Sequence, residues 1–146
     1  AVLSECSSIG EIADQADAGI PVMRIDEAMM AEAARIGRPV LLCATLATTL
    51  EPSMRLLQRE CAGRLKAESL LLADAYRLLQ TEGKEAHDRA IASRLEQPLR
   101  EGKTIVLAQA SMAAAAQYLP EGLPGAMLTS PESGVALFAR RVQSNA

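Results

Sequence analysis

The chain has 146 residues, of which 49% are hydrophobic and 23% are charged, and its formal net charge is −3. This length and composition are typical of one folded domain and exclude a disordered or fibrous protein. One Phe, two Tyr and no Trp leave few rings for stacking bases, and the negative charge does not attract phosphate backbones, so nucleic-acid binding is not expected.

The chain shows no targeting or membrane signal. No apolar run approaches the ~20 residues that span a bilayer, and the opening AVLSECSS lacks the basic leader and apolar stretch of a signal peptide. We therefore expect a cytoplasmic protein with no membrane partner. Three cysteines cannot all pair, so we interpret them as reduced thiols, and one histidine without a Cys/His cluster predicts no metal site.

Five short apolar runs each end at small polar residues and are followed by sequence with helical character. In chain order they are AVLSECSS, PVMRI, PVLLCATLATT, KTIVLAQAS and PGAMLTSP. This repetition of strand, loop and helix predicts an α/β fold with a mainly parallel sheet flanked by helices. No linker and no repeat of fixed period divides residues 1–146, so we predict a single α/β unit.

A helix is predicted after the third run. The segment Glu51-Pro52-Ser53 would open it, and its apolar stripe would be Met54, Leu57, Cys61 and Leu65. This pattern places Cys61 in the core. Cys43 lies within an apolar strand, so core packing is favoured over reactivity for that residue as well.

Residues 67–102 predict two further helices. Gly83 would separate the two helices, and Pro98 would kink or end the second. A short strand is expected near Ser69–Leu72. His87 is placed at the edge of the second helix and is assigned no chemistry.

Small polar residues follow most of the predicted strands. They are Cys6, Ser7, Ser8, Thr45, Thr48, Thr49, Gln109, Ser111, Thr129 and Ser130. In parallel α/β sheets, ligands bind beyond the carboxyl ends of the strands, so these residues are candidates for one site. Cys6 is suited to thiolate chemistry. Alternatively, Cys6 is a small hydrophobic residue that only fills space in the core. The threonines suit a carboxylate cradle, and the alternative is ordinary helix capping.

The segments CSSIGEIADQA, IPVMRIDEAM, VLLCATLATTLEPS, VLAQASMA and LTSPESGV, in this order, resemble the aspartate/glutamate/hydantoin racemase superfamily. The resemblance runs from residue 1 to about Val142 and implies two similar α/β halves with the active site between them. The chain would hold one complete half plus part of the other, the C-terminal two-thirds of such a protein, with further strands and helices preceding it. The family works without pyridoxal phosphate or metal, and two cysteines on opposite sides of the substrate Cα act as bases.

Carried over by position, the resemblance implies that Cys6 is a catalytic base and that Gln109 stands where the second cysteine is expected. Glutamine donates and accepts hydrogen bonds but cannot move a proton near neutral pH. Substrate-binding residues would be Ser7, Ser8, Thr45, Thr48 and Ser111, with the two threonines holding a carboxylate.

We therefore expect a cofactor-independent amino-acid or hydantoin racemase that transfers a proton at the carbon α to a carboxylate, with Cys6 as base, and that forms a homo-oligomer. The alternatives are a one-cysteine decarboxylase or isomerase of the same superfamily, and a non-catalytic module that binds a small acid. A purely structural oligomerisation fragment is a third alternative, and it does not explain the polar strand ends.

Overall fold

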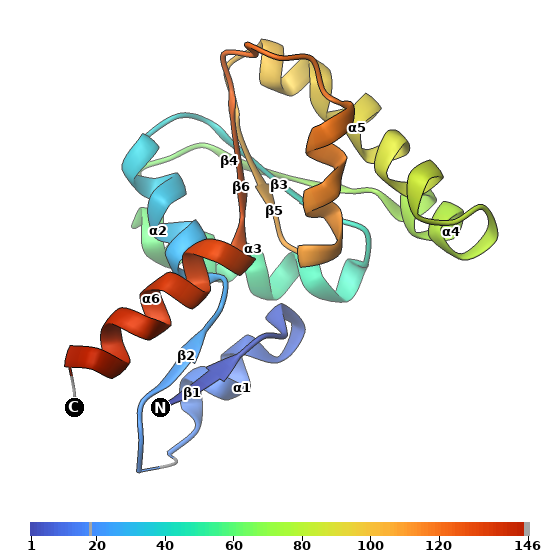
Figure 1. The fold of residues 1–146 in the computed structure, drawn as a ribbon. Coiled ribbons are helices and arrows are strands. Elements are labelled where there is room, and N and C mark those ends of the chain that lie inside the picture. Colours follow the sequence, from blue (N-terminus) through green and yellow to red (C-terminus); the bar gives the residue numbers. More distant parts are fainter. Residues whose placement is uncertain (18, 145–146) are drawn as a thin grey trace.

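The computed structural model describes residues 1–17 and 19–144 and has the α/β architecture predicted from the sequence (Figure 1). The strands of this part of the chain are β1 (Val2–Ser4), β2 (Val22–Arg24), β3 (Val40–Ala44), β4 (Ala67–Leu71), β5 (Thr104–Leu107) and β6 (Ala126–Thr129). All five predicted runs form strands, and β4 overlaps the short strand expected near Ser69–Leu72. The strands make two parallel sheets, β1-β2 and β4-β3-β5-β6, where the sequence predicted one.

The helices of the described residues alternate with the strands. They are η1 (Ser7–Ile9), α1 (Gly10–Gln15), α2 (Glu27–Ile36), α3 (Ala47–Cys61), α4 (Ala73–Thr81), α5 (Lys84–Arg100), η2 (Ala110–Tyr118) and α6 (Ser130–Ser144). None of the described helices is both long enough and apolar enough to cross a bilayer.

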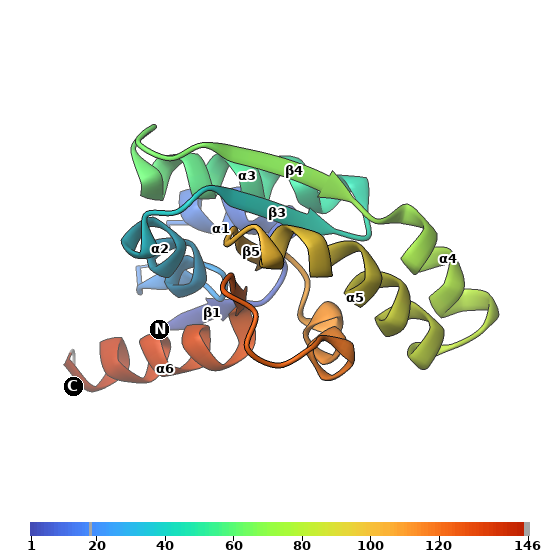
Figure 2. The ribbon, with the colours of Figure 1, turned by 90° about the horizontal axis from the view of Figure 1, so that it is seen from above.

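Strand β3 shows why the larger sheet is buried on both faces. Its residues alternate between two cores: Val40, Leu42 and Ala44 pack with α2 and α3, whereas Leu41 and Cys43 pack with α4, α5 and η2. Figure 2 shows the larger sheet between these groups of helices. Because helices cover both faces, β3 is apolar throughout rather than alternating with polar residues. Cys43 and Cys61 are buried, as predicted.

Helix α3 begins four residues earlier than predicted, at Ala47, so Pro52 lies inside it instead of opening it. Only two residues separate β3 from α3, and the buried side chains Leu56 and Leu57 anchor the helix against the sheet. Tertiary packing therefore outweighs the loss of one backbone N–H at Pro52.

The end of α3 differs from the predicted stripe. The helix stops at Cys61 because Ala62 and Gly63 adopt positive φ angles of 48° and 70°. Leu65 therefore lies beyond the helix, although it still packs against the core formed with α2.

Gly83, with φ 92°, separates α4 from α5 as predicted, and α5 runs through Pro98 to Arg100. The prediction for His87 was wrong. This residue is fully buried, and its Nδ1 lies 2.8 Å from Oδ1 of Asp88. The reason is that α5 packs against both α4 and η2, so its apolar stripe is covered on more than one side.

A buried arginine ties the N-terminal segment to the rest of the fold. Arg24 is 2% exposed, and its Nε and Nη2 each donate a 2.9 Å hydrogen bond to the carboxylate of Asp26. Its Nη1 lies 3.5 Å from Asp14 of α1, and Gly10 packs on the guanidinium so closely that a Cβ there would lie 2.3 Å from Cζ. The cluster thus joins α1, β2 and the start of α2.

Candidate functional site

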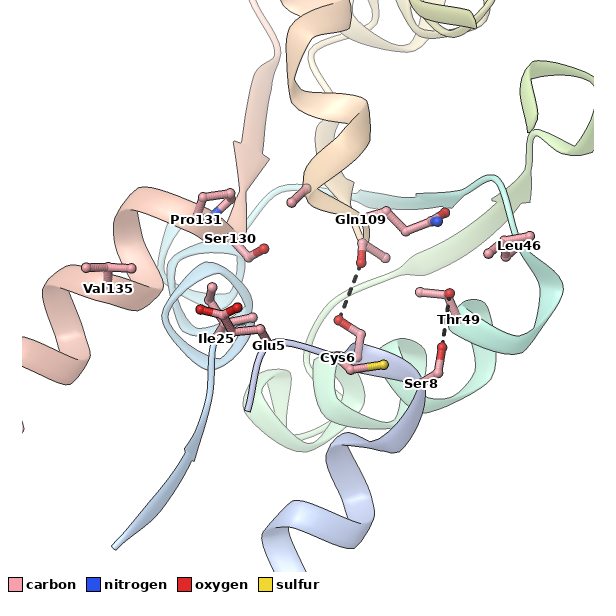
Figure 3. Close-up of a pocket in the computed structure, with 13 residues that line it drawn as sticks. Glu5, Cys6, Ser8, Ile25, Leu46, Thr49, Gln109, Ser130, Pro131 and Val135 are labelled. Atoms are coloured by element: carbon pink, nitrogen blue, oxygen red, sulfur yellow. Dashed lines mark hydrogen bonds between the residues drawn. The ribbon is translucent and has the colours of Figure 1, made fainter. Parts of the chain in front are cut away.

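A cavity of about 520 Å³ opens where the carboxyl ends of the strands from both sheets meet (Figure 3). Segments that follow β1, β2, β3, β5 and β6 all contribute to its wall. The lining residues are Glu5, Cys6, Ser7, Ser8, Ile25, Leu46, Thr49, Ala108, Gln109, Ala110, Ser130, Pro131 and Val135. This is the place where parallel α/β folds bind ligands.

Cys6 is the accessible thiol of the three cysteines. It follows β1, precedes η1, is exposed and lines the cavity. Burial raises the pKa of Cys43 to about 12, and burial followed by the charge of Glu60 raises the pKa of Cys61. Since the thiolate is the reactive form of cysteine, burial and a raised pKa make these two thiols less reactive than an accessible one.

Two serines connect the segment that carries Cys6 to the larger sheet and to α3. The Ser7 hydroxyl donates a 3.4 Å hydrogen bond to the carbonyl of Ala108, at the end of β5. The Ser8 hydroxyl lies 3.3 Å from Oγ1 of Thr49, and either oxygen can donate. Figure 3 shows both contacts as dashed lines. They hold Cys6 at the junction of the two sheets.

The predicted threonines occupy different environments. Thr45 is buried behind the cavity wall and contacts Gln109, whereas Thr48 is exposed on α3 and does not line the cavity. Thr49, one residue further along the helix, is buried and lines it. Ser111 is likewise exposed and outside the lining, where Ala110 lies instead.

The side chain of Gln109 has a fixed orientation. Its Oε1 accepts two hydrogen bonds from Thr45, one from the backbone N–H at 2.6 Å and one from Oγ1 at 3.0 Å. A backbone N–H can only donate, so the atom that faces it is the amide oxygen. The amide nitrogen, with two N–H donors, has no partner within residues 1–17 and 19–144. Because Gln109 lines the cavity, these donors are available to a ligand.

The electrostatics of the cavity combine one formal charge with neutral donors and helix ends. Glu5 carries the one carboxylate in its described lining, and no Lys, Arg or His is present there. Helices α3 and α6 begin at the cavity wall, next to Leu46 and at Ser130. The amino ends of helices carry partial positive charge, which favours an anion at this position. In the described part of the chain no group of three or more His, Cys, Asp or Glu side chains is placed to hold a metal.

Six apolar lining residues were not predicted from the sequence: Ile25, Leu46, Ala108, Ala110, Pro131 and Val135. Ile25 follows β2, and Val135 lies one turn into α6, far away in the chain. Apolar residues just after a strand or inside a helix resemble ordinary core residues, so the sequence contains no signal that separates them from the core.

Comparison of the sequence with protein-family models and with curated proteins finds no match. Solved structures do match. The glutamate racemase isoform RacE1 from Bacillus anthracis superimposes with a TM-score of 0.71 at 16% sequence identity, over 99% of this chain and 58% of that chain. The chain thus spans 58% of the length of that racemase. Its α/β fold, with parallel sheets flanked by helices, is similar to that of glutamate racemase.

Proposed function

We propose that the cavity is the active site of a racemase-type enzyme that moves a proton at the carbon next to a carboxylate, with Cys6 as the base. One observation carries the proposal: the accessible thiol lines the same cavity as a glutamine whose amide oxygen is bonded to Thr45 and whose amide nitrogen has no partner among the described residues. The likeness of the fold to that of a glutamate racemase adds support at the level of the superfamily.

Three groups are suited to bind the carboxylate of a small substrate. They are the amide N–H groups of Gln109, the hydroxyl pair of Ser8 and Thr49, and the amino end of α3. In this proposal Thr45 positions Gln109, and Ser7 holds the segment of Cys6. Thr48 and Ser111, both exposed outside the cavity, have no role in binding.

The proton transfer then needs no group outside the cavity. The Cys6 thiolate takes the Cα proton, and the electron pair of the C–H bond moves into the carboxylate to give an enediolate. Donors that already face the carboxylate stabilise the added charge on its oxygens. The Cys6 thiol returns a proton to the same carbon, so no cofactor is part of the proposal.

Gln109 makes this a one-base site in the proposal, because an amide cannot take or deliver the proton on the other face of Cα. That feature also suits the second candidate, a one-cysteine decarboxylase or isomerase. In a decarboxylase, loss of CO₂ leaves the electron pair on Cα, and Cys6 delivers one proton to it. A small-acid binding module would bind the acid at the same donors without turnover.

One experiment separates these functions. The protein is incubated in D₂O with amino acids, hydantoins and 2-substituted malonates, and Cα exchange and CO₂ release are followed by NMR. Exchange that disappears in Cys6→Ser supports the proposal, and CO₂ release from a malonate supports the decarboxylase. Binding of an acid with no exchange in any compound would leave only the binding module.

We also propose a homo-oligomer in the cytoplasm. Four large apolar side chains, Val2, Ile9, Ile12 and Ile20, are between 45% and 71% exposed in the N-terminal segment, and association would remove them from water. Sedimentation at micromolar concentration should show a species larger than the monomer. A stable monomer would contradict the oligomer.

A further inference from the structure

The cavity is divided into a polar side and an apolar side. In Figure 3 the donors Gln109, Thr49 and Ser8 lie to one side of Cys6, and Ile25, Pro131 and Val135 lie to the other. An acid whose carboxylate meets the donors places its Cα near Cys6. Its substituent then extends over the apolar side, where contact with apolar side chains favours an uncharged group.

The apolar side offers no cation that would pair with a second carboxylate. Ser130 and the amino end of α6 also lie there, but a helix end carries only about half an elementary charge, whereas the Glu5 carboxylate carries a full negative charge. No Lys, Arg or His belongs to the described lining, and Glu5 lies beside Ile25 at this side. A second carboxylate there would lose part of its hydration and face a like charge, and both effects oppose binding.

Two cations that lie close to lining residues in the sequence, Arg24 and Arg55, are already engaged elsewhere. Arg24 is buried against Asp26 and Asp14, and its side chain is not part of the cavity wall. Arg55 of α3 pairs with Glu11 and Glu51. Either guanidinium would have to leave a carboxylate partner in order to reach a ligand.

We infer that the substrate is a monocarboxylic acid whose substituent at Cα is uncharged and apolar, and that Glu5 selects against diacids. This inference rests on the proposed function, because it takes the donors around Gln109 as the site of the single carboxylate. It extends that function by assigning the substrate class and a specificity-determining residue.

The test uses two acids of equal chain length, pentanoate and pentanedioate, which differ in a terminal methyl group against a terminal carboxylate. Ligand-observed NMR titration of the complete chain gives both dissociation constants without requiring turnover. Pentanoate should bind at least about tenfold more tightly, which corresponds to about 1.4 kcal/mol. Equal binding, or tighter binding of pentanedioate, overturns the inference while leaving the carboxylate site in place.

A charge reversal tests the role of Glu5. In Glu5→Lys the preference for pentanoate over pentanedioate should fall at least about tenfold, since a cation then faces the second carboxylate. Glu82→Lys is the matched control, because Glu82 is an exposed residue at the end of α4 that does not line the cavity. The control should keep the preference of the unmodified chain.

An equal change in both variants would show that net charge, rather than the position of Glu5, sets the preference, and would overturn the assignment of Glu5. Failure of both acids to bind the unmodified chain would remove the carboxylate site itself, and the proposed function would fall with it.

Discussion

Replacing Gly10 by alanine should destabilise the protein by acting on Arg24. The new Cβ would lie 2.3 Å from Cζ of the guanidinium and 2.4 Å from Nε, where non-bonded atoms normally stay about 3.5–4.0 Å apart. Arg24 must therefore move by more than about 1 Å, which takes both 2.9 Å hydrogen bonds to Asp26 beyond bonding distance.

The size of the expected loss in unfolding free energy follows from the burial of the ion pair, since Arg24 and Asp26 are 2% and 1% exposed. Breaking a buried ion pair costs about 3–5 kcal/mol. The helix gains up to about 1 kcal/mol when alanine replaces glycine. The expected net loss of unfolding free energy is about 2–4 kcal/mol, and urea denaturation should show it as a midpoint lower by about 1 M or more.

A double-mutant cycle separates this mechanism from a general effect of the substitution. In an Arg24→Ala background the clash is absent, so Gly10→Ala should cause no loss of stability and can raise the unfolding free energy by up to about 1 kcal/mol. Equal losses in both backgrounds, or no loss in the unmodified chain, would refute the contribution of the Gly10–Arg24 contact to stability.

Three further predictions concern the thiols, the core and the carboxylate donors. After brief treatment with iodoacetamide at pH 8, mass mapping should find Cys6 modified first. The reason is that burial raises the pKa of Cys43 to about 12, and a protonated thiol does not react. Earlier labelling of Cys43 would contradict the assignment of the nucleophile. Leu95→Ala should lower the unfolding free energy by about 2–5 kcal/mol in urea denaturation, since Leu95 is fully buried. A loss below about 1 kcal/mol would show that the core between the sheet and α4, α5 and η2 is not tightly packed. Thr45→Val should weaken pentanoate binding by releasing one hydrogen bond to Gln109, whereas Thr48→Val should leave it unchanged; the opposite pattern would place the carboxylate at Thr48.

Much of the fold could be predicted from the sequence because the strands of a parallel sheet are locally distinctive. The strand Val40–Ala44 is apolar throughout, and Thr104–Leu107 is apolar after its first residue, since helices cover both faces. Small polar residues mark where each strand ends. Gly83 could also be read correctly, because its positive φ is a local requirement of the turn between α4 and α5.

Other features depend on packing that no local pattern contains. Arg24 and Asp26 look like surface charges in the sequence, yet they are buried because α1 and the start of α2 close over them. Thr48 and Thr49 are adjacent and chemically identical, and only the rotation of about 100° per helical residue decides which one meets the cavity. The orientation of Gln109 likewise depends on Thr45, which lies 64 residues away in the chain.

The stereochemistry of Cα exchange in D₂O tests the central claim most directly. With Cys6 as the single base, one enantiomer of an apolar amino acid should lose its Cα proton with retention of configuration, and its mirror image should stay nearly unlabelled. Cys6→Ser should abolish the exchange. Gln109→Cys removes one carboxylate donor but leaves Ser8, Thr49 and the amino end of α3, and it should add racemisation by supplying a thiol on the other face. Racemisation of both enantiomers at comparable rates by the unmodified chain, or exchange that persists in Cys6→Ser, would contradict a one-base site built on Cys6.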